Sequence, residues 1–246
     1  METRNIKLVI AYKGTHYHGW QIQKDKITVQ GEIQKHLSVL LNHGVVLFGA
    51  SRTDAGVHAL GQTGNFHTTS QKETEVIHHA LNKRLPVDIY IKKVQEVPLD
   101  FHARKNAQGK HYQYRIWISK EKPVFESETI YWLGDKKIDL ESMITAARQI
   151  EGTHDFTSFA SNAGRKDENK IRTIDTIAIT ERYPLLVIDV TGVSFLYKMV
   201  RGICGTLLEI GRGKSLDIPA ILKDRARGSA ARNLPPQGLT LMKVFY

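Results

Sequence analysis

The sequence predicts an α+β protein, layered from helices and sheets and built in two halves. Apolar residues recur with a period of two in some segments and of three to four in others, which is typical of strands and helices respectively. The succession of strand and helix runs through the chain twice, once before and once after about residue 105. The 246 residues are 41% apolar, enough for two small domains with real cores. We therefore expect two α/β halves, residues 1–105 and 106–246, rather than one doubly wound sheet.

The N-terminal half is expected to contain four strands and two helices. The predicted strands are residues 6–12, 45–50, 61–68 and 89–94. The segment 45–50, VVLFGA, is continuously apolar, which is typical of a strand covered on both faces. One helix is predicted over 29–41, and a second over 76–85 that stops at Pro86 because proline breaks a helix.

The C-terminal half is expected to follow a similar but looser order. A strand at 111–118 precedes a helix at 140–150, and the strands 173–181 and 185–192 are expected to form a hairpin. The last predicted elements are an apolar helix at 194–210, a short helix at 217–226 and a strand at 239–246.

The charge of the chain favours a polyanionic partner. Lys and Arg outnumber Asp and Glu by 35 to 25, a formal net charge of +10, and nucleic acid is the commonest partner of so basic a protein. The alternative is a generically basic protein without such a partner. The segments 102–110 and 161–170 are polar, basic and contain glycine, so we expect positively charged loops there.

Several classes of protein are disfavoured. Cys204 is the only cysteine, which excludes an internal disulfide and a zinc site built on cysteine pairs. The six-residue apolar run near the N-terminus is too short for a signal peptide. Charged residues interrupt the longest apolar stretch, 193–210, which favours a buried helix over a membrane span. We expect a cytoplasmic protein that makes no use of a membrane.

The segment GASRTDAGVHALGQ, residues 49–62, has the position of a ligand site. It follows an apolar strand, and ligand-binding residues gather where strands end. Gly56 would permit a backbone with positive φ just after Asp54. The alternative is that Asp54 is an ordinary turn residue, hydrogen-bonded to nearby amides.

The apolar helix contains an arginine that is expected to be at least partly buried. A helix that is apolar nearly all round is buried, and a guanidinium there needs an anion or several acceptors. For Arg201, Asp54 is one candidate partner, and such a pair would keep the carboxylate ionised and oriented. Asp189, Glu209 or solvent are the alternatives, and spacing does not separate them.

Two tyrosines fall on one face of the strand 111–118. Alternation places Tyr112 and Tyr114 together with Ile116 and Ile118. Either both rings pack in the core with satisfied hydroxyls, or one of them stacks on a nucleobase.

Six stretches resemble, in order, the tRNA pseudouridine synthase A family over nearly the whole chain. SRTDAGVHALGQ, residues 51–62, is similar to the family's central signature. The other five are YKGTHYHGWQIQ (12–23), FHARKNAQGKHYQYRIW (101–117), HDFTSFA (154–160), SFLYKMVRGICGTLLEIGRG (194–213) and LPPQGLTLMKVFY (234–246). Two departures are visible: Ser51 stands where glycine is usual, and Gly202 where asparagine is common.

The resemblance implies the pseudouridine synthase fold, with two ferredoxin- or RRM-like halves of antiparallel and mixed sheets that meet at a central basic cleft. It implies a homodimeric isomerase, with one tRNA bridging both subunits, that converts uridine to pseudouridine at positions 38, 39 and 40 of the anticodon stem-loop. It implies no cofactor and no metal.

The resemblance also assigns roles to residues. Asp54 matches the catalytic aspartate, Tyr112 the tyrosine that packs on the target base, and Arg201 the arginine that pairs with the aspartate. Arg52 matches the arginine thought to enter the RNA stem as the uridine leaves it. The basic residues expected to contact tRNA phosphates are Arg104, Lys105 and Lys110.

Two rival functions remain open on the sequence alone. One is an RNA-binding protein without chemistry, and the other is a metal-dependent hydrolase or phosphotransferase that uses Asp54 on a small anion. No second carboxylate near Asp54 in sequence could share a metal with it, which disfavours the second rival. Whether Asp54 attacks C1′, attacks C6 or assists elimination is not decided by the sequence.

Overall fold

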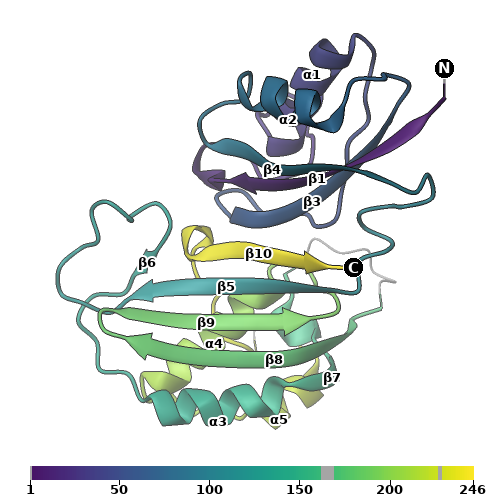
Figure 1. Cartoon of the computed structure of the whole chain (residues 1–246). Helices are drawn as coiled ribbons and strands as arrows, with labels where there is room; N and C mark the ends of the chain where they lie inside the picture. The colour runs from purple at the N-terminus through teal and green to yellow at the C-terminus, as the bar shows by residue number, and fades with distance from the viewer. Residues whose placement is uncertain (1, 162–168, 227–228) are drawn as a thin grey trace. The chain divides into compact units, whose positions relative to one another are not determined.

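The computed structural model describes residues 2–161, 169–226 and 229–246 (Figure 1). The chain forms two compact units: unit 1 comprises residues 1–108 and 240–246, and unit 2 comprises residues 109–239. The α+β class is confirmed. Residues 240–246 group with unit 1, whereas the sequence analysis assigned them to the C-terminal half. Most of the basic loop predicted at 161–170 lies outside the described residues.

Unit 1 is a sheet covered on one face by two helices (Figure 1). The antiparallel strands β4 (Ile89–Val97), β1 (Arg4–Tyr12) and β3 (His58–Thr68) lie in that order. Next to β3 lies the C-terminal strand β10 (Leu239–Phe245), parallel to it. The helices are α1 (Val29–Leu41) and α2 (Thr74–Asn82). Val29, Ile33 and Leu37 lie on the buried face of α1, as their spacing predicts.

The expectation that residues 45–50 form a strand buried on both faces is wrong. Only β2 (Phe48–Gly49) is a strand, paired with β3. Val45 and Leu47 are buried, but Val46 and Phe48 are exposed, 61% and 37% respectively. Buried and exposed residues therefore alternate from Val45 to Phe48, so the continuous apolar run has only one buried face.

Unit 2 has four main antiparallel strands with three helices on one face (Figure 1). The strands lie in the order β5 (Gly109–Trp117), β9 (Leu185–Gly192), β8 (Ile171–Arg182) and β7 (Gly152–Asp155), and the short β6 (Tyr131–Trp132) pairs with β5. The hairpin predicted for 173–192 is thus β8 and β9. The helices are α3 (Leu140–Ile150), α4 (Met199–Gly211) and α5 (Ile218–Asp224).

Helix α4 is the buried apolar helix that the sequence predicts, but it starts five residues later. Lys198 has a left-handed backbone, with φ +60°, and precedes the first helical residue, Met199. Tyr197 therefore lies outside the helix and is 42% exposed. All residues from Met199 to Leu208 are buried, including Arg201, so the predicted burial of this arginine is confirmed.

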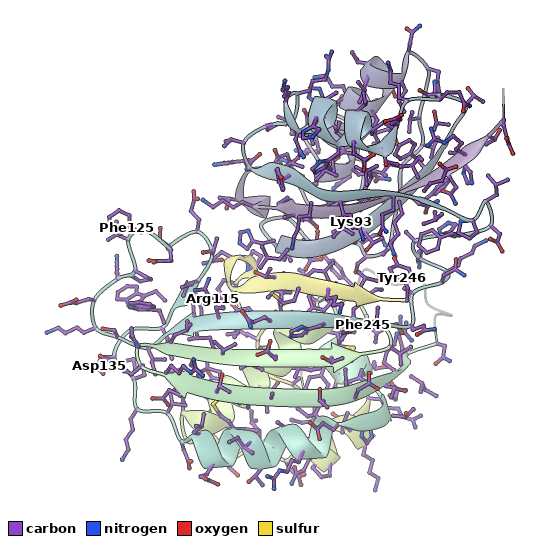
Figure 2. All side chains as sticks on the ribbon, in the orientation of Figure 1. Lys93, Arg115, Phe125, Asp135, Phe245 and Tyr246 are labelled. Carbon is purple, nitrogen blue, oxygen red and sulfur yellow. The ribbon has the colours of Figure 1, made fainter. Side chains whose placement is uncertain are left out.

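The sheet faces opposite the helices carry polar and charged side chains. Lys93 on β4 in unit 1 and Arg115 on β5 in unit 2 are examples (Figure 2). In β5, the buried Tyr112, Tyr114 and Ile116 alternate with half-buried polar neighbours, as the sequence predicts.

Replacement of Gly205 by alanine should destabilise unit 2. A Cβ atom there would lie 2.2 Å from the backbone oxygen of Arg232, so either the helix or the 232 segment must move. Overpacking of this kind costs about 1–3 kcal/mol, more than the gain of about 1 kcal/mol from better helix propensity. We expect urea unfolding to show a lower free energy of unfolding. Gly44→Ala is the control, since a Cβ there meets nothing within 4 Å, and should leave stability unchanged or slightly raised.

Candidate active site

The loop that carries Asp54 is fixed by a buried glutamine from the neighbouring strand. Gln62 on β3 is fully buried, and its amide nitrogen donates to the Ser51 carbonyl at 2.7 Å. Its amide oxygen accepts from the backbone N–H groups of Ser51 and Thr63, both at 3.2 Å. Buried backbone groups must find partners, and here one side chain serves both polar groups of Ser51. The backbone that presents Arg52 is thus held at its first residue.

A second group of contacts holds the loop at Thr53. Its hydroxyl shares a 2.7 Å hydrogen bond with the Tyr12 hydroxyl, and its carbonyl accepts from the Trp20 N–H at 3.1 Å. Gly19 lets this approach happen: its φ is +86°, and a Cβ atom there would lie 2.6 Å from the Thr53 oxygen.

The loop then turns immediately after the aspartate. The Val57 N–H donates to the Asp54 carbonyl at 3.1 Å, and Gly56 has φ +77°, the positive value that the sequence predicts. This turn directs the chain back into the sheet at His58, the first residue of β3.

Burial alternates along the loop. Ser51 and Thr53 are buried, whereas Arg52 is exposed and Asp54 is half-buried. Arg52 Nη1 lies 3.4 Å from Gln21 Oε1, to which it donates. The sequence therefore places an exposed cation and a partly exposed carboxylate two residues apart on a rigid backbone.

In unit 2, Tyr112 and Arg201 come from the two layers that make the core. Tyr112, on β5, is 6% exposed, and its ring meets the Phe195 ring edge-on with 5.2 Å between centroids. Arg201, on α4, donates from Nε to the Leu234 carbonyl at 2.7 Å, and the Leu234 N–H donates back to the Arg201 carbonyl at 3.2 Å. The pairing of Arg201 with Asp54 stays a prediction.

The alternative partners suggested for Arg201 have other contacts. Glu209 forms ion pairs with Arg212 and Lys214. Asp189 Oδ1 lies 2.6 Å from His111 Nε2 and accepts from Gln113 at 3.0 Å. The Leu234 carbonyl, which no sequence pattern indicates, is the partner that the geometry adds.

Tyr114 packs in the core rather than at a ligand site. Its hydroxyl donates to the Pro235 carbonyl at 2.6 Å. Burial raises the pKa of this hydroxyl far above its ordinary value, and the nearby Arg201 cation opposes that shift only in part. Tyr114 therefore stays protonated. Burial likewise raises the pKa of the Cys204 thiol, which makes it unreactive.

Comparison with known proteins gives the same family as the sequence motifs. The profile of a family described as tRNA pseudouridine synthase matches residues 8–104 and 146–246. A tRNA pseudouridine synthase A of Acetivibrio thermocellus is 45% identical over 99% of this chain and 100% of its own length. A tRNA pseudouridine synthase A 2 of Clostridium tetani is 43% identical over 99% of each chain. One of Geobacillus kaustophilus is 42% identical over 99% of this chain and 95% of its own.

The chain belongs to the tRNA pseudouridine synthase family. The predicted pseudouridine synthase fold therefore holds, and the family's chemistry is the isomerisation of tRNA uridine. Against a solved chain from a Cbf5–Nop10–Gar1 complex, the likeness is loose, with 11% identity over 96% of this chain and 57% of that one, and a TM-score of 0.39.

The three basic residues expected to contact tRNA are distributed over both units of this pseudouridine synthase. Arg104 and Lys105 are exposed in unit 1, and Lys110 is half-buried on β5 in unit 2. The turn that presents Arg104 and Lys105 is anchored at the fully buried Ala103, whose N–H donates to Asn65 Oδ1 at 2.8 Å and whose carbonyl accepts from the Tyr246 hydroxyl at 2.7 Å. The two cations thus extend from an ordered backbone.

Tyr246 directly follows the last residue of β10 (Figure 2). Its burial raises the pKa of its hydroxyl to about 12, so it remains a hydrogen-bond donor to Ala103 at neutral pH. Lys7 lies over this ring at 4.2 Å and over the Phe101 ring at 5.2 Å. Burial and the neighbouring Lys93 lower the pKa of Lys7.

Within the described part of the chain, no three His, Cys, Asp or Glu side chains lie close enough to hold a metal ion. Among the same residues, no helix combines the length and apolar character needed to cross a membrane.

The sequence analysis missed the residues that hold the aspartate loop. Gln62, Tyr12, Thr53 and Gly19 all lie in stretches that resemble the family, but no role was assigned to them. One signal was available: a glutamine and an asparagine interrupt the strand 61–68, and polar residues inside a central strand need buried partners.

Arg201→Lys should lower the free energy of unfolding of this pseudouridine synthase. Lysine keeps the charge but cannot reproduce the Nε donor, so the buried Leu234 carbonyl loses its partner. Loss of such a bond costs about 1–3 kcal/mol in the free energy of unfolding, measurable by urea denaturation. Arg212→Lys is the control, because its side chain is 40% exposed and pairs with Glu209 at the surface. It should change stability by about 0.5 kcal/mol or less; equal losses in both variants would contradict the special role of Arg201.

Proposed function

We propose that this protein isomerises uridine to pseudouridine at positions 38, 39 and 40 in the anticodon stem-loop of tRNA. Membership of the tRNA pseudouridine synthase family supports the reaction, and the curated relatives named tRNA pseudouridine synthase A support the choice of substrate. The observation that carries the proposal is the loop at 51–54, where buried contacts fix a backbone that exposes Arg52 beside Asp54.

The reaction rearranges bonds within one nucleotide. The N1–C1′ bond breaks, the uracil turns, C5 bonds to C1′, the C5 proton leaves and N1 gains a proton. The base must first leave the stem, because its reacting atoms are shielded within the stack. No oxidant or reductant enters this balance.

Each proposed role uses a property of the side chain. Asp54 supplies the carboxylate that attacks the nucleotide or assists its elimination. Arg52, exposed next to it, fills the space that the uridine vacates. By the family resemblance, Tyr112 packs on the flipped base and Arg201 pairs with the catalytic carboxylate.

Binding is proposed to depend on phosphate contacts from Arg104, Lys105 and Lys110, which read the shape of the RNA more than its sequence. The net charge of +10 supports an RNA substrate. By the same resemblance we propose a cytoplasmic homodimer in which one tRNA contacts both subunits.

Asp54→Asn should abolish isomerisation without preventing tRNA binding. The amide keeps the size of the side chain but removes the charge that the chemistry needs, and loss of such a group costs about 10⁴-fold or more in rate. Tritium release from tRNA that contains 5-³H-uridine measures the reaction, and filter binding measures affinity. Release that persists in Asp54→Asn would refute the role of Asp54. Absence of release from the wild type, with tRNA still bound, would favour an RNA-binding protein without chemistry.

Arg52→Ala should slow turnover on structured tRNA by about 10²-fold while affinity changes little, because the side chain acts when the base has left the stack. The measurement is kcat and Kd for intact tRNA at several salt concentrations. Arg104→Ala is the comparison: a phosphate contact should weaken binding and reduce the salt dependence by about one ion, with kcat nearly unchanged. If Arg52→Ala behaves like Arg104→Ala, Arg52 is an ordinary phosphate contact.

A further inference from the structure

We infer that Tyr12 is a positioning residue for catalysis, which acts on Asp54 through the hydroxyl of Thr53. The inference rests on the proposed function, since it assumes that Asp54 is the catalytic carboxylate. It begins from the hydrogen bond between the Tyr12 and Thr53 hydroxyls, 2.7 Å long and buried, with 5% and 7% of the two residues exposed.

Strand pairing on both sides holds the backbone of Tyr12 in place. Tyr12 is the last residue of β1, opposite Ala59 on β3 and Ile89 on β4, so its backbone is held from both sides. The register of β1 shifts between Ile10 and Tyr12 against β3, which marks an irregularity in the ladder just before Tyr12. The Tyr12 ring also packs near the Trp20 ring, with 6.0 Å between centroids.

Thr53 connects the loop 51–54 to the sheet through its hydrogen bonds. Two of its polar groups have partners in unit 1: the hydroxyl bonds to the Tyr12 hydroxyl, and the carbonyl accepts from the Trp20 N–H. With Gln62 holding Ser51, the buried Ser51 and Thr53 alternate with the exposed Arg52 and the half-buried Asp54. Arg52 and Asp54 therefore have little freedom to move separately from the sheet.

The consequence for catalysis follows from geometry. A carboxylate that reacts with one atom of a flipped nucleotide must be placed to within a fraction of an ångström, and a misplacement of about 1 Å can cost about 10²-fold in rate. The affinity for tRNA depends instead on many phosphate contacts distributed over the surface. Loss of the Tyr12–Thr53 bond should therefore lower kcat and leave KM nearly unchanged.

The test compares single-hydroxyl deletions. Tyr12→Phe and Thr53→Val each remove one hydroxyl and keep the shape of the side chain, and the double variant removes both. Tyr17→Phe is the matched control, because Tyr17 is equally buried, 6% exposed, and its hydroxyl donates at 2.5 Å to Asp88 rather than to a residue of the loop 51–54. Asp54→Asn is included as the benchmark of the proposed function. Kinetics use tRNA with 5-³H-uridine, and thermal unfolding by circular dichroism verifies the fold.

We expect kcat to fall about 10-fold or more in Tyr12→Phe and in Thr53→Val, with KM within about twofold of the wild type. The double variant should be no worse than the poorer single one, since both remove the same bond. Tyr17→Phe should retain the wild-type kcat.

Other results would overturn the inference in distinguishable ways. An unchanged kcat in Tyr12→Phe with an inactive Asp54→Asn removes the role of Tyr12 but leaves that of Asp54. A raised KM at constant kcat, or an equal loss in Tyr17→Phe, would make Tyr12 a residue of binding or of general stability. Activity that survives in Asp54→Asn would remove the proposed function and this inference together.

Discussion

The loops of unit 1 depend on two amide side chains buried in strand β3. A loop that leaves a sheet and remains partly buried has backbone N–H and C=O groups with no strand to pair with, and each one left unpaired costs about 1–3 kcal/mol. Gln62 supplies these partners for Ser51, and Asn65 supplies one for Ala103. The two amides are three positions apart along a regular part of β3, so their side chains point to opposite faces of the sheet.

This arrangement explains how the loop 51–54 can be irregular and still have partners for its buried backbone groups. From Ser51 to Asp54 the chain alternates between buried and outward residues, the pattern of a strand, although no ladder of backbone hydrogen bonds runs along it. Side chains supply hydrogen bonds in place of a ladder. The Gln62 amide bonds to the backbone of Ser51, and the Tyr12 hydroxyl bonds to the Thr53 hydroxyl. These contacts hold the backbone on both sides of the exposed Arg52 and just before the half-buried Asp54.

Patterns of neighbouring residues predicted those features of the fold that depend on interactions within a single helix or strand. The buried face of α1 and the alternation in β5 follow from residues three, four or two apart, and both predictions are confirmed. The burial of Arg201 follows from the apolar character of its own helix. Two expectations failed: Val46 and Phe48 in segment 45–50 are exposed, and α4 starts only after the left-handed Lys198.

The site was only partly predictable, because its supports come from distant parts of the chain. The family motifs pointed to Asp54 and Arg52, but Tyr12 and Thr53 are 41 positions apart in the sequence, and Arg201 and Leu234 are 33 positions apart. No periodicity extends over such distances. A polar residue within an otherwise apolar element, such as Gln62 in β3 or Arg201 in α4, signals that a partner exists without saying which.

The surroundings of Arg201 show how small residues make such distant partners possible. Gly205 lies against the Arg232 backbone, and Gly202 lies so close to the Phe159 carbonyl that a Cβ atom would be 2.7 Å from it. The two segments can therefore approach α4 closely enough for the Leu234 carbonyl to reach the guanidinium. At Gly202, where the family commonly has asparagine, the nearby space holds the Asn233 side chain, whose oxygen would lie 3.2 Å from the added Cβ. Asn233 also donates to the Ser161 hydroxyl at 3.1 Å. The side-chain amide next to position 202 thus comes from Asn233 rather than from residue 202 itself. The hydrogen-bond partner of Arg201 thus depends on how closely the segment at 231–234 packs against Gly202 and Gly205 of α4, and not on the helix sequence alone.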